Sequence, residues 1–348
     1  MVILGIDAHK RTHTVVAIDD AGRKVGEKTT GSTTTEAHLE LVRWADRFGT
    51  KRRWAVEDCR HLSRRLEADL LAAGEQIVRV PPKLMAHARD AARTYGKSDP
   101  IDALAVARAA LREPRLPAAR LDGPSRELRL LVDHREDLVR DRTAHINRLR
   151  WHLHELDPAW DPTPRSLVRF KHLDAVAARL QMMQGTVARI ARELVGAIRE
   201  LTEKANALQR EILELVRSLA PTLLQVTGVA ELTAAKIVAE VADVRRFRSK
   251  DAFARHNGTA PLPVWSSNRV RHRLSRTGNR QLNAALHRIA VTQMRCHEEA
   301  RSYLERRVAI GNTNREALRA LKRRLSDVIY RALLTDAPSM TAPVEDAA

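Results

Sequence analysis

The feature that most constrains this chain is an acidic residue placed in an otherwise apolar segment near the N-terminus. Residues 2–6 read Val-Ile-Leu-Gly-Ile, and Asp7 follows them directly. A carboxylate within a buried strand is costly unless it is paired with another charge or bound to a metal. We therefore interpret residues 2–7 as a core strand that presents a functional carboxylate.

Three further acidic residues occur where secondary structure can bring them to Asp7. Glu57 ends a second short apolar segment, and Asp99 and Asp102 flank a proline that suits the first turn of a helix. On such a helix the two aspartates share one face at its positive end. Carboxylate oxygens bind hard divalent cations such as Mg²⁺, and two such ions can activate a phosphodiester. The four acids therefore predict a metal site.

The first 120 residues alternate between strand-like and helix-like patterns. Strands are predicted at residues 2–7, 12–19, 24–30, 54–57 and 76–80, and helices at 34–49, 61–73 and within 83–112. This order predicts an α/β domain over residues 1–120, of the ribonuclease-H-like class that holds two Mg²⁺ with acids on strands and a helix.

A long, charged, helical pattern follows over residues 121–218, interrupted by a proline-rich stretch at 157–164. Two helices of this length commonly form an antiparallel or intermolecular coiled coil, which would make the segment an oligomerisation arm. A solvated helical spacer fits the same periodicity equally well.

Residues 219–335 are predicted to form a third, mostly helical domain, with a disordered tail at 336–348. Residues 226–240 place Gly228 before an alanine-rich helical segment, which is typical of a helix-hairpin-helix unit whose amides meet a phosphate. An ordinary turn between helices gives the same pattern.

Basic residues dominate the chain and gather in one region. The formal net charge is +18, and residues 245–288 contain eleven Arg or Lys against one acid. Such an excess predicts contact with the phosphates of DNA. The nucleic-acid-binding candidates are Arg245, Arg246, Arg248, Lys250, Arg269, Arg271, Arg273, Arg276 and Arg280. No apolar run is long enough for a membrane span and no secretory leader is evident, so a cytoplasmic, nucleoid-associated protein is expected.

Two serines lie inside this basic region. Ser266 and Ser267 precede several arginines, which could lower the pKa of a hydroxyl and stabilise charge at a phosphorus atom under attack. Serines in a basic loop also serve as simple hydrogen-bond donors to phosphate. The sequence leaves both roles open.

Taken together, these segments resemble the DEDD-type insertion-sequence transposases, which include minicircle element transposases and pilin-gene invertases and are described as bridge-RNA-guided serine recombinases. The matching segments are residues 5–10, 55–60, 97–103, 224–247, 257–261 and 271–286. The resemblance implies a RuvC-like domain in which Asp7, Glu57, Asp99 and Asp102 bind Mg²⁺, followed by a coiled-coil arm and a C-terminal transposase domain.

The resemblance also implies a mechanism and partners. A serine would attack the DNA backbone to give a covalent phosphoserine, and the acids of a partner subunit would complete the site. Double-stranded DNA at the element ends and target, a structured noncoding guide RNA and a homo-oligomer from dimer to tetramer are the implied partners. Ungapped spacing to residues 271–274 favours Ser266 as nucleophile, whereas matching on the serine pair favours Ser267.

Two other functions fit the same residues. A Mg²⁺-dependent junction resolvase or DDE-like transposase would cut phosphodiesters directly at the four acids, without a covalent intermediate. A basic architectural or RNA-binding protein would rely on charge alone.

Overall fold

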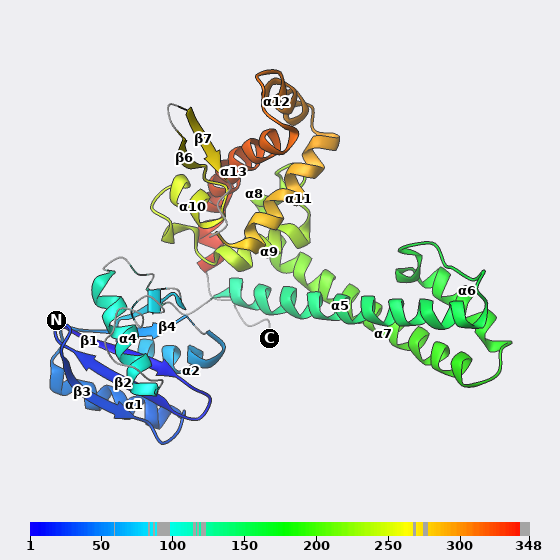
Figure 1. Ribbon diagram of the computed structural model, residues 1–348. Coiled ribbons are helices and arrows are strands. Elements are labelled where there is room, and N and C mark those ends of the chain that lie inside the picture. The colour runs from blue at the N-terminus through cyan, green and yellow to red at the C-terminus, as the bar shows by residue number, and fades with distance from the viewer. Residues whose placement is uncertain are drawn as a thin grey trace. The chain divides into compact units, whose positions relative to one another are not determined.

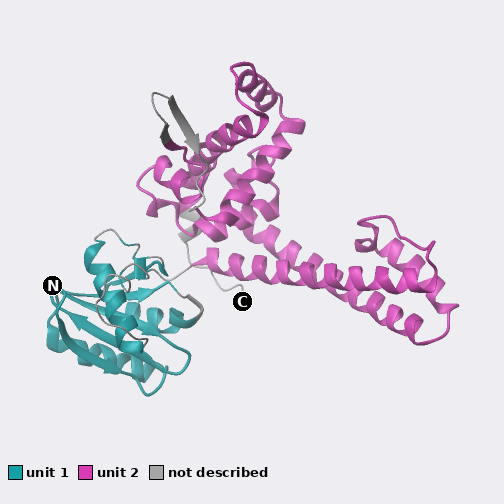
Figure 2. Cartoon of the chain, in the orientation of Figure 1, with its two compact units in different colours: residues 1–121 teal, residues 122–348 magenta. Residues whose placement is uncertain are grey.

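The computed structural model describes residues 1–58, 60–82, 84–85, 88, 98–113, 116, 118–119, 123–266, 269–273 and 278–341. For residues 264–266 and 269–273 it describes the path of the backbone. The chain forms two compact units, residues 1–121 and 122–348 (Figure 2). The four predicted metal ligands belong to the first unit, and the basic segment with its serines belongs to the second.

The first unit contains a five-stranded mixed sheet. Its strands are β1 (Val2–Ala8), β2 (His13–Ile18), β3 (Lys24–Thr29), β4 (Arg52–Glu57) and β5 (Ile77–Val80). Their order across the sheet is β3-β2-β1-β4-β5 (Figure 1). The first three strands form an antiparallel meander, and β4 and β5 continue the sheet parallel to β1.

Helices cover both faces of this sheet. Helix α1 (Thr35–Ala45), the short 3-10 helix η1 (Asp46–Phe48) and α2 (Arg60–Ala72) accompany one face, and α4 (Asp99–Arg112) lies on the other. Alternate side chains of β1 serve the two cores, because successive strand residues point to opposite faces. Leu4 and Ile6 pack with α1 and α2, whereas Ile3 packs with the alanines of α4.

Gly5 explains how closely α4 approaches the sheet. A Cβ atom at this position would lie 2.2 Å from the carbonyl oxygen of Ala103 and 2.5 Å from the amide nitrogen of Ala107. The backbone of α4 therefore crosses directly over β1. This crossing carries Asp99 and Asp102, in the first turn of α4, to the end of β1 where Asp7 lies.

The strand order and directions are those of the ribonuclease-H-like fold. The predicted strands at 2–7, 12–19, 24–30, 54–57 and 76–80 are all present within a few residues of their predicted limits. The prediction of an α/β N-terminal domain of the ribonuclease-H-like class is confirmed at this level. Most of the predicted helical stretch between residues 83 and 97 lies outside the described residues.

The second unit begins with a long helical hairpin. Helix α5 (Pro124–Leu156) runs outward, and α7 (Thr186–Leu219) runs back beside it (Figure 1). Arg135 donates to Gln209 and Arg142 donates to Thr202, so a step of seven residues along α5 matches seven in the reverse direction along α7. The helices are therefore antiparallel partners within one chain. A contact with a second chain stays a prediction.

The hairpin has a separate core at its far end. There α6 (Phe170–Gln181) and the short helix η2 (Ser166–Val168) pack on α5 and α7 around Leu149, Leu153 and Ile198. At the other end, Leu128 and Val216 belong to the core of the C-terminal region. The hairpin thus connects two hydrophobic cores, and its base is part of the larger one.

The C-terminal region is mostly helical, as predicted. Its elements are α8 (Pro221–Leu224), α9 (Glu231–Val241), η3 (Val244–Arg246), α10 (Lys250–His256), β6 (Leu262–Ser266), β7 (Arg269–Arg273), α11 (Arg280–Cys296), α12 (Glu298–Ala309) and α13 (Asn314–Thr341). The Gly228 turn separates α8 from α9, and its φ of +85° suits glycine. Because α8 has only four residues, the predicted helix-hairpin-helix element has a shortened first helix.

The predicted tail begins too early. Helix α13 continues to Thr341, so residues 336–341 are helical rather than disordered. Asp336 is buried, and its carboxylate accepts hydrogen bonds from the backbone amides of Thr222 and Leu223 at 3.1 and 3.0 Å. This carboxylate satisfies the first amides of α8, which explains why the last helix persists to this point. Residues 342–348 lie outside the described residues.

Candidate active site

Asp7 occupies the end of β1, on the face of the sheet that α4 covers. The residue is only 7% exposed, and its Oδ2 atom accepts no hydrogen bond of good geometry among the described residues, although the imidazole Nε2 of His9 lies 3.2 Å away. A buried carboxylate oxygen without a donor is destabilising, and functional sites are where such atoms are retained. Asp7 is therefore the residue around which the site is built.

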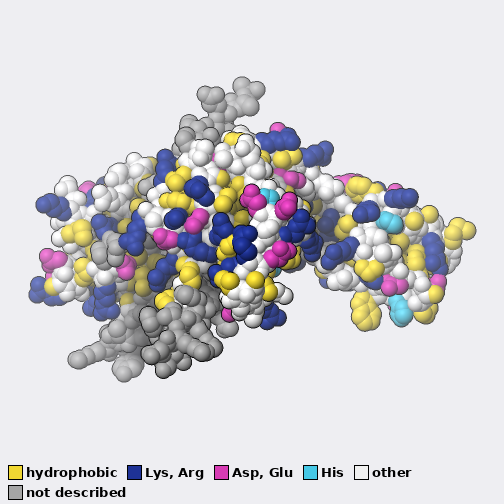
Figure 3. Space-filling view, turned by 90° about the horizontal axis from the view of Figure 1, so that it is seen from above, with side chains coloured by type: hydrophobic (Ala, Val, Ile, Leu, Met, Phe, Trp, Pro, Cys, Tyr) yellow, Lys and Arg dark blue, Asp and Glu magenta, His cyan; other side chains and the backbone are white. Residues whose placement is uncertain are grey.

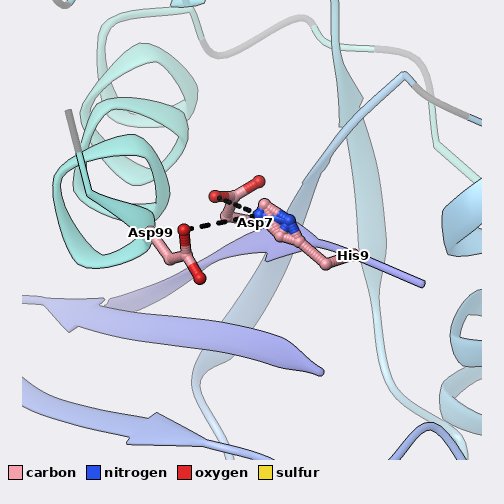
Figure 4. A group of neighbouring side chains, drawn as sticks. All are labelled: Asp7, His9 and Asp99. Carbon is pink, nitrogen blue, oxygen red and sulfur yellow. Dashed lines mark ion pairs between the residues drawn. The ribbon is translucent and has the colours of Figure 1, made fainter. Parts of the chain in front are cut away.

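His9 joins Asp7 to Asp99. Its Nε2 lies 3.2 Å from Asp7 Oδ2 and 3.5 Å from Asp99 Oδ1, and Figure 4 shows the imidazole between the two carboxylates. One ligand atom from each residue can be chosen so that all three lie within 4.8 Å of one another. Sequence reasoning missed His9 as a site residue. The sequence pattern that could have identified it is its position two residues after Asp7, because side chains two residues apart on a strand lie on the same face.

Glu57 and Asp102 complete the acidic group. Glu57 ends β4, which pairs in parallel with β1, and Asp102 lies one helical turn after Asp99 and is 8% exposed. Burial raises the pKa of Asp7 to about 6, with further increases from Asp102, Asp99 and Glu57 that His9 partly offsets. All three acids are thus near enough to act on Asp7 electrostatically, while the ligand atoms within 4.8 Å of one another are those of Asp7, His9 and Asp99.

The donor set fits a divalent cation. The three neighbouring acids oppose the ionisation of Asp7, and a cation that neutralises the group would offset both this repulsion and the cost of burying the Asp7 carboxylate. Carboxylate oxygen ligands of this kind suit Mg²⁺ or Mn²⁺. A divalent metal site is the arrangement that these residues support best.

The predicted serine lies in a two-stranded hairpin of the second unit. Ser266 is the last residue of β6, and the backbone pairs it with Arg269 at the start of β7. Arg271 and Arg273 follow on β7. Ser267 and Arg276 lie outside the described residues. The hairpin therefore gathers Ser266 and three of the predicted arginines into two adjacent strands.

A buried polar network precedes the hairpin. Asn257 is fully buried, donates to Ser326 at 2.8 Å and accepts from the hydroxyl of Thr259 at 2.7 Å. Asn283 donates to the carbonyl of Asn257 at 2.8 Å and accepts from Lys322 at 2.6 Å. Buried networks in which each amide has partners hold their elements rigidly. This network ties the loop before β6 to α11 and α13.

A glycine closes the hairpin from its other side. A Cβ atom on Gly278 would lie 2.3 Å from the amide nitrogen of Gly258 and 2.5 Å from its Cα. The amide of Asn279 also donates to the carbonyl of His256 at 2.6 Å. The chain therefore enters and leaves the hairpin at one point, fixed by backbone contact.

The basic residues before the hairpin lie on the surface. Arg245, Arg246, Arg248 and Lys250 are exposed, as is Arg280 at the start of α11. Arg246 donates toward His256 at 3.2 Å, next to the entry of the hairpin. Lys and Arg side chains, in dark blue, are abundant on the face seen in Figure 3, among scattered acidic side chains. Such a surface suits a polyanion.

Two family models match the chain, and together they cover more than half of it. A model described as "Transposase", of the DEDD type, matches residues 4–158, and one described as "Transposase IS116/IS110/IS902 family" matches residues 220–305. The chain belongs to the IS116/IS110/IS902 family of transposases. The first match contains all four carboxylates, and the second contains the basic segment and the hairpin.

Curated relatives resemble the transposase over almost its whole length. The "Insertion element IS116 uncharacterized 44.8 kDa protein" of Streptomyces clavuligerus is 29% identical, with 97% of each chain covered. The "Insertion element IS900 uncharacterized 42 kDa protein" of Mycobacterium paratuberculosis is 28% identical, with 95% of each covered. Both are products of insertion elements, as expected for a transposase.

Solved structures similar to the transposase include two of Thermus thermophilus RuvC. One is in complex with a Holliday junction substrate and has a TM-score of 0.27 and 15% identity, covering 34% of this chain and 99% of RuvC. The other has a TM-score of 0.28 and 17% identity, with 34% and 100% covered. The strand order β3-β2-β1-β4-β5 is the feature that defines the fold of the first unit. None of the described helices has the length and apolar character needed to cross a bilayer.

Proposed function

We propose that this transposase cuts DNA strands at the acidic site of its first unit with the help of a divalent metal, most simply Mg²⁺. The observation that carries the proposal is the buried carboxylate of Asp7, which accepts no hydrogen bond of good geometry among the described residues, lies with His9 and Asp99 in one group of possible metal ligands, and has its pKa raised by burial and by three acids. A cation is the partner that such an atom requires. The substrate, DNA, follows from the family and from the net charge of +18.

Each side chain has a role in this proposal. Asp7, Glu57, Asp99 and Asp102 would hold the cation, which when bound activates a water or hydroxyl and stabilises charge on the phosphate. His9 contacts Asp7 and Asp99, so it orients both carboxylates and can accept or return a proton at Nε2. The exposed Arg245, Arg246 and Arg248 would bind the DNA backbone.

A second route uses a serine as the nucleophile. The hydroxyl oxygen of Ser266 or Ser267 would form a bond to phosphorus while the bridging oxygen of the DNA leaves with a proton, and a DNA hydroxyl would later reverse the transfer. Supporting this route, Ser266 pairs with Arg269 in a hairpin rooted in a buried network. The acids of a partner subunit would then complete the site. Direct metal-dependent cleavage has the broader support and is the route we favour.

One experiment separates the two routes. DNA carrying the element ends is incubated with the transposase and Mg²⁺, and the products are resolved on a denaturing gel with and without protease treatment. Direct cleavage gives free ends, no protease-sensitive species, and full activity in a variant carrying both Ser266→Ala and Ser267→Ala. The serine route gives a protein–DNA adduct that this double variant abolishes. Retention of cleavage by Asp7→Asn would refute the metal site in both routes.

Partners beyond DNA are part of the proposal as well. We place a structured noncoding guide RNA and a dimer to tetramer among them, with residues 121–218 as the oligomerisation arm. In support of such an arm, Trp151 and Met182 are 76% and 86% exposed near its end. Light scattering of the purified protein before and after Trp151→Glu tests the arm. Sequencing of RNA that copurifies with the protein tests the guide.

A further inference from the structure

A second cluster of titratable side chains lies in the first unit. A cavity of about 250 Å³ is lined by His9, His13 and His38 together with the longer side chains of Lys10 and Arg65. His13 begins β2 and His38 lies on α1, so two of the histidines come from elements on the α1 and α2 side of the sheet. The acidic site uses neither His13 nor His38.

His38 is held in one tautomer by a carboxylate. The residue is fully buried, and its Nδ1 lies 2.6 Å from Oδ2 of Asp69 on α2. Nδ1 therefore donates to the carboxylate, which leaves Nε2 as the ring nitrogen that can bind a ligand. That Nε2 atom is buried and has no hydrogen-bond partner among the described residues. A carboxylate behind a histidine is the arrangement that orients a metal-binding imidazole.

His13 offers a second nitrogen beside the first. The residue is 1% exposed, and its Nδ1 is also buried without a hydrogen-bond partner in the described part of the chain. Burial lowers the pKa of His13 to about 4, with smaller effects from His38 and His9, so the ring is neutral at pH 7. A neutral imidazole protonated on Nε2 carries its lone pair on Nδ1.

The spacing of the two rings suits a shared ion. Their centroids are 5.2 Å apart with an angle of 32° between the planes. Two imidazoles bound to one tetrahedral ion at Zn–N distances of about 2.0–2.1 Å have centroids roughly 5 Å apart.

We propose that His13 and His38 form a second metal site, selective for a nitrogen-preferring ion of the Zn²⁺ class, with Asp69 positioning His38. The site is separate from the acidic one, because His13 shares its face of β2 with Val15 and Ala17, which pack with α1 and α2 rather than with α4. Positions not filled by the two histidines would face the cavity and bind water or an oxygen of a bound molecule. His13 lies on β2, His38 on α1 and Asp69 on α2, so a metal bound here would stabilise the packing of these three elements.

Cobalt binding to the full-length protein tests the proposal. Co²⁺ serves as the probe because its visible absorption reports tetrahedral nitrogen coordination, and Asp7→Asn is the starting protein so that the acidic site is disabled. We expect one equivalent to bind with a visible band, and Zn²⁺ to displace it and raise the melting temperature. Absence of the band, or its loss on replacing Co²⁺ with excess Mg²⁺, would overturn the proposal.

Variants locate the site. In the Asp7→Asn protein, His13→Gln or His38→Gln should abolish the band, and Asp69→Asn should weaken affinity by about 10- to 100-fold. His172→Gln, which removes an exposed histidine on α6, is the matched control and should bind as before. If His38→Gln does not fold, His13→Gln still decides the matter, because an unchanged Co²⁺ band in that variant refutes the site.

Discussion

The substitution Asp7→Asn should raise the stability of the first unit and abolish its function. Burial and three neighbouring acids raise the pKa of Asp7 from 3.8 to about 6 in the folded protein. A shift of this size corresponds to about 3 kcal/mol, because each pH unit is worth about 1.36 kcal/mol. The carboxylate is nearly as buried as the residue itself, with 9% of the side chain exposed, so solvent screening reduces this figure little.

The direction in which the free energy of unfolding changes with pH follows from how tightly the folded and unfolded states bind the Asp7 proton. Below about pH 4 the Asp7 carboxyl is protonated in both the folded and the unfolded state, so its ionisation does not change the free energy of unfolding. Between about pH 4 and 6 the folded state holds its proton more tightly than the unfolded state, so stability falls as pH rises, and above pH 6 the full penalty of about 3 kcal/mol applies. Asparagine removes this penalty. Without metal at pH 8, Asp7→Asn should therefore be the more stable protein, although it should not cut DNA.

Denaturant unfolding followed by tryptophan fluorescence, to which the buried Trp54 of β4 contributes, measures this effect between pH 4 and 8. Mg²⁺ should stabilise the wild type, by about 2.7 kcal/mol at 100 times its dissociation constant, and leave Asp7→Asn unchanged. Asp20→Asn, at an exposed turn between β2 and β3, is the control and should follow the wild-type pH profile. A less stable Asp7→Asn protein at pH 8, or a flat wild-type profile, would refute the reasoning.

Four more outcomes are expected. Gly5→Ala should cost about 3 kcal/mol in thermal unfolding and abolish Mg²⁺ binding, because its Cβ would push α4 from β1; unaltered Mg²⁺ affinity would contradict this. His9→Gln should weaken Mg²⁺ binding in calorimetry with little change in melting temperature, and equal affinities would exclude His9 from the site. Asn257→Ala should lower unfolding stability by about 1–3 kcal/mol while sparing Mg²⁺ binding. Arg248→Ala should reduce the salt dependence of DNA binding by about one unit of slope, and an unchanged slope would remove Arg248 from the interface.

The acidic residues could be predicted because strong local patterns place them. Asp7 and Glu57 each end an apolar run, and such runs form central strands whose order in an α/β sheet leaves few choices. The helix that carries Asp99 and Asp102 was signalled by the proline between them. Their approach to Asp7 depends on the close contact at Gly5, which sequence spacing alone does not state.

The histidines escaped prediction because their surroundings are built by tertiary contacts. His9 is significant only because α4 brings Asp99 within 3.5 Å of it. His13 and His38 are twenty-five residues apart in the sequence and meet through the packing of α1 on the sheet. The early end assigned to the last helix had a similar cause, because the buried contact of Asp336 with α8 spans more than one hundred residues.

The reciprocal seven-residue register of α5 and α7 limits how this protein family can change in size. An insertion in one helix alone would slide every later pair past its partner and turn the apolar seam away from it. Lengthening is tolerated when both helices gain equal blocks that restore the seam. Homologous chains of different length should therefore carry insertions or deletions of equal length in these two helices.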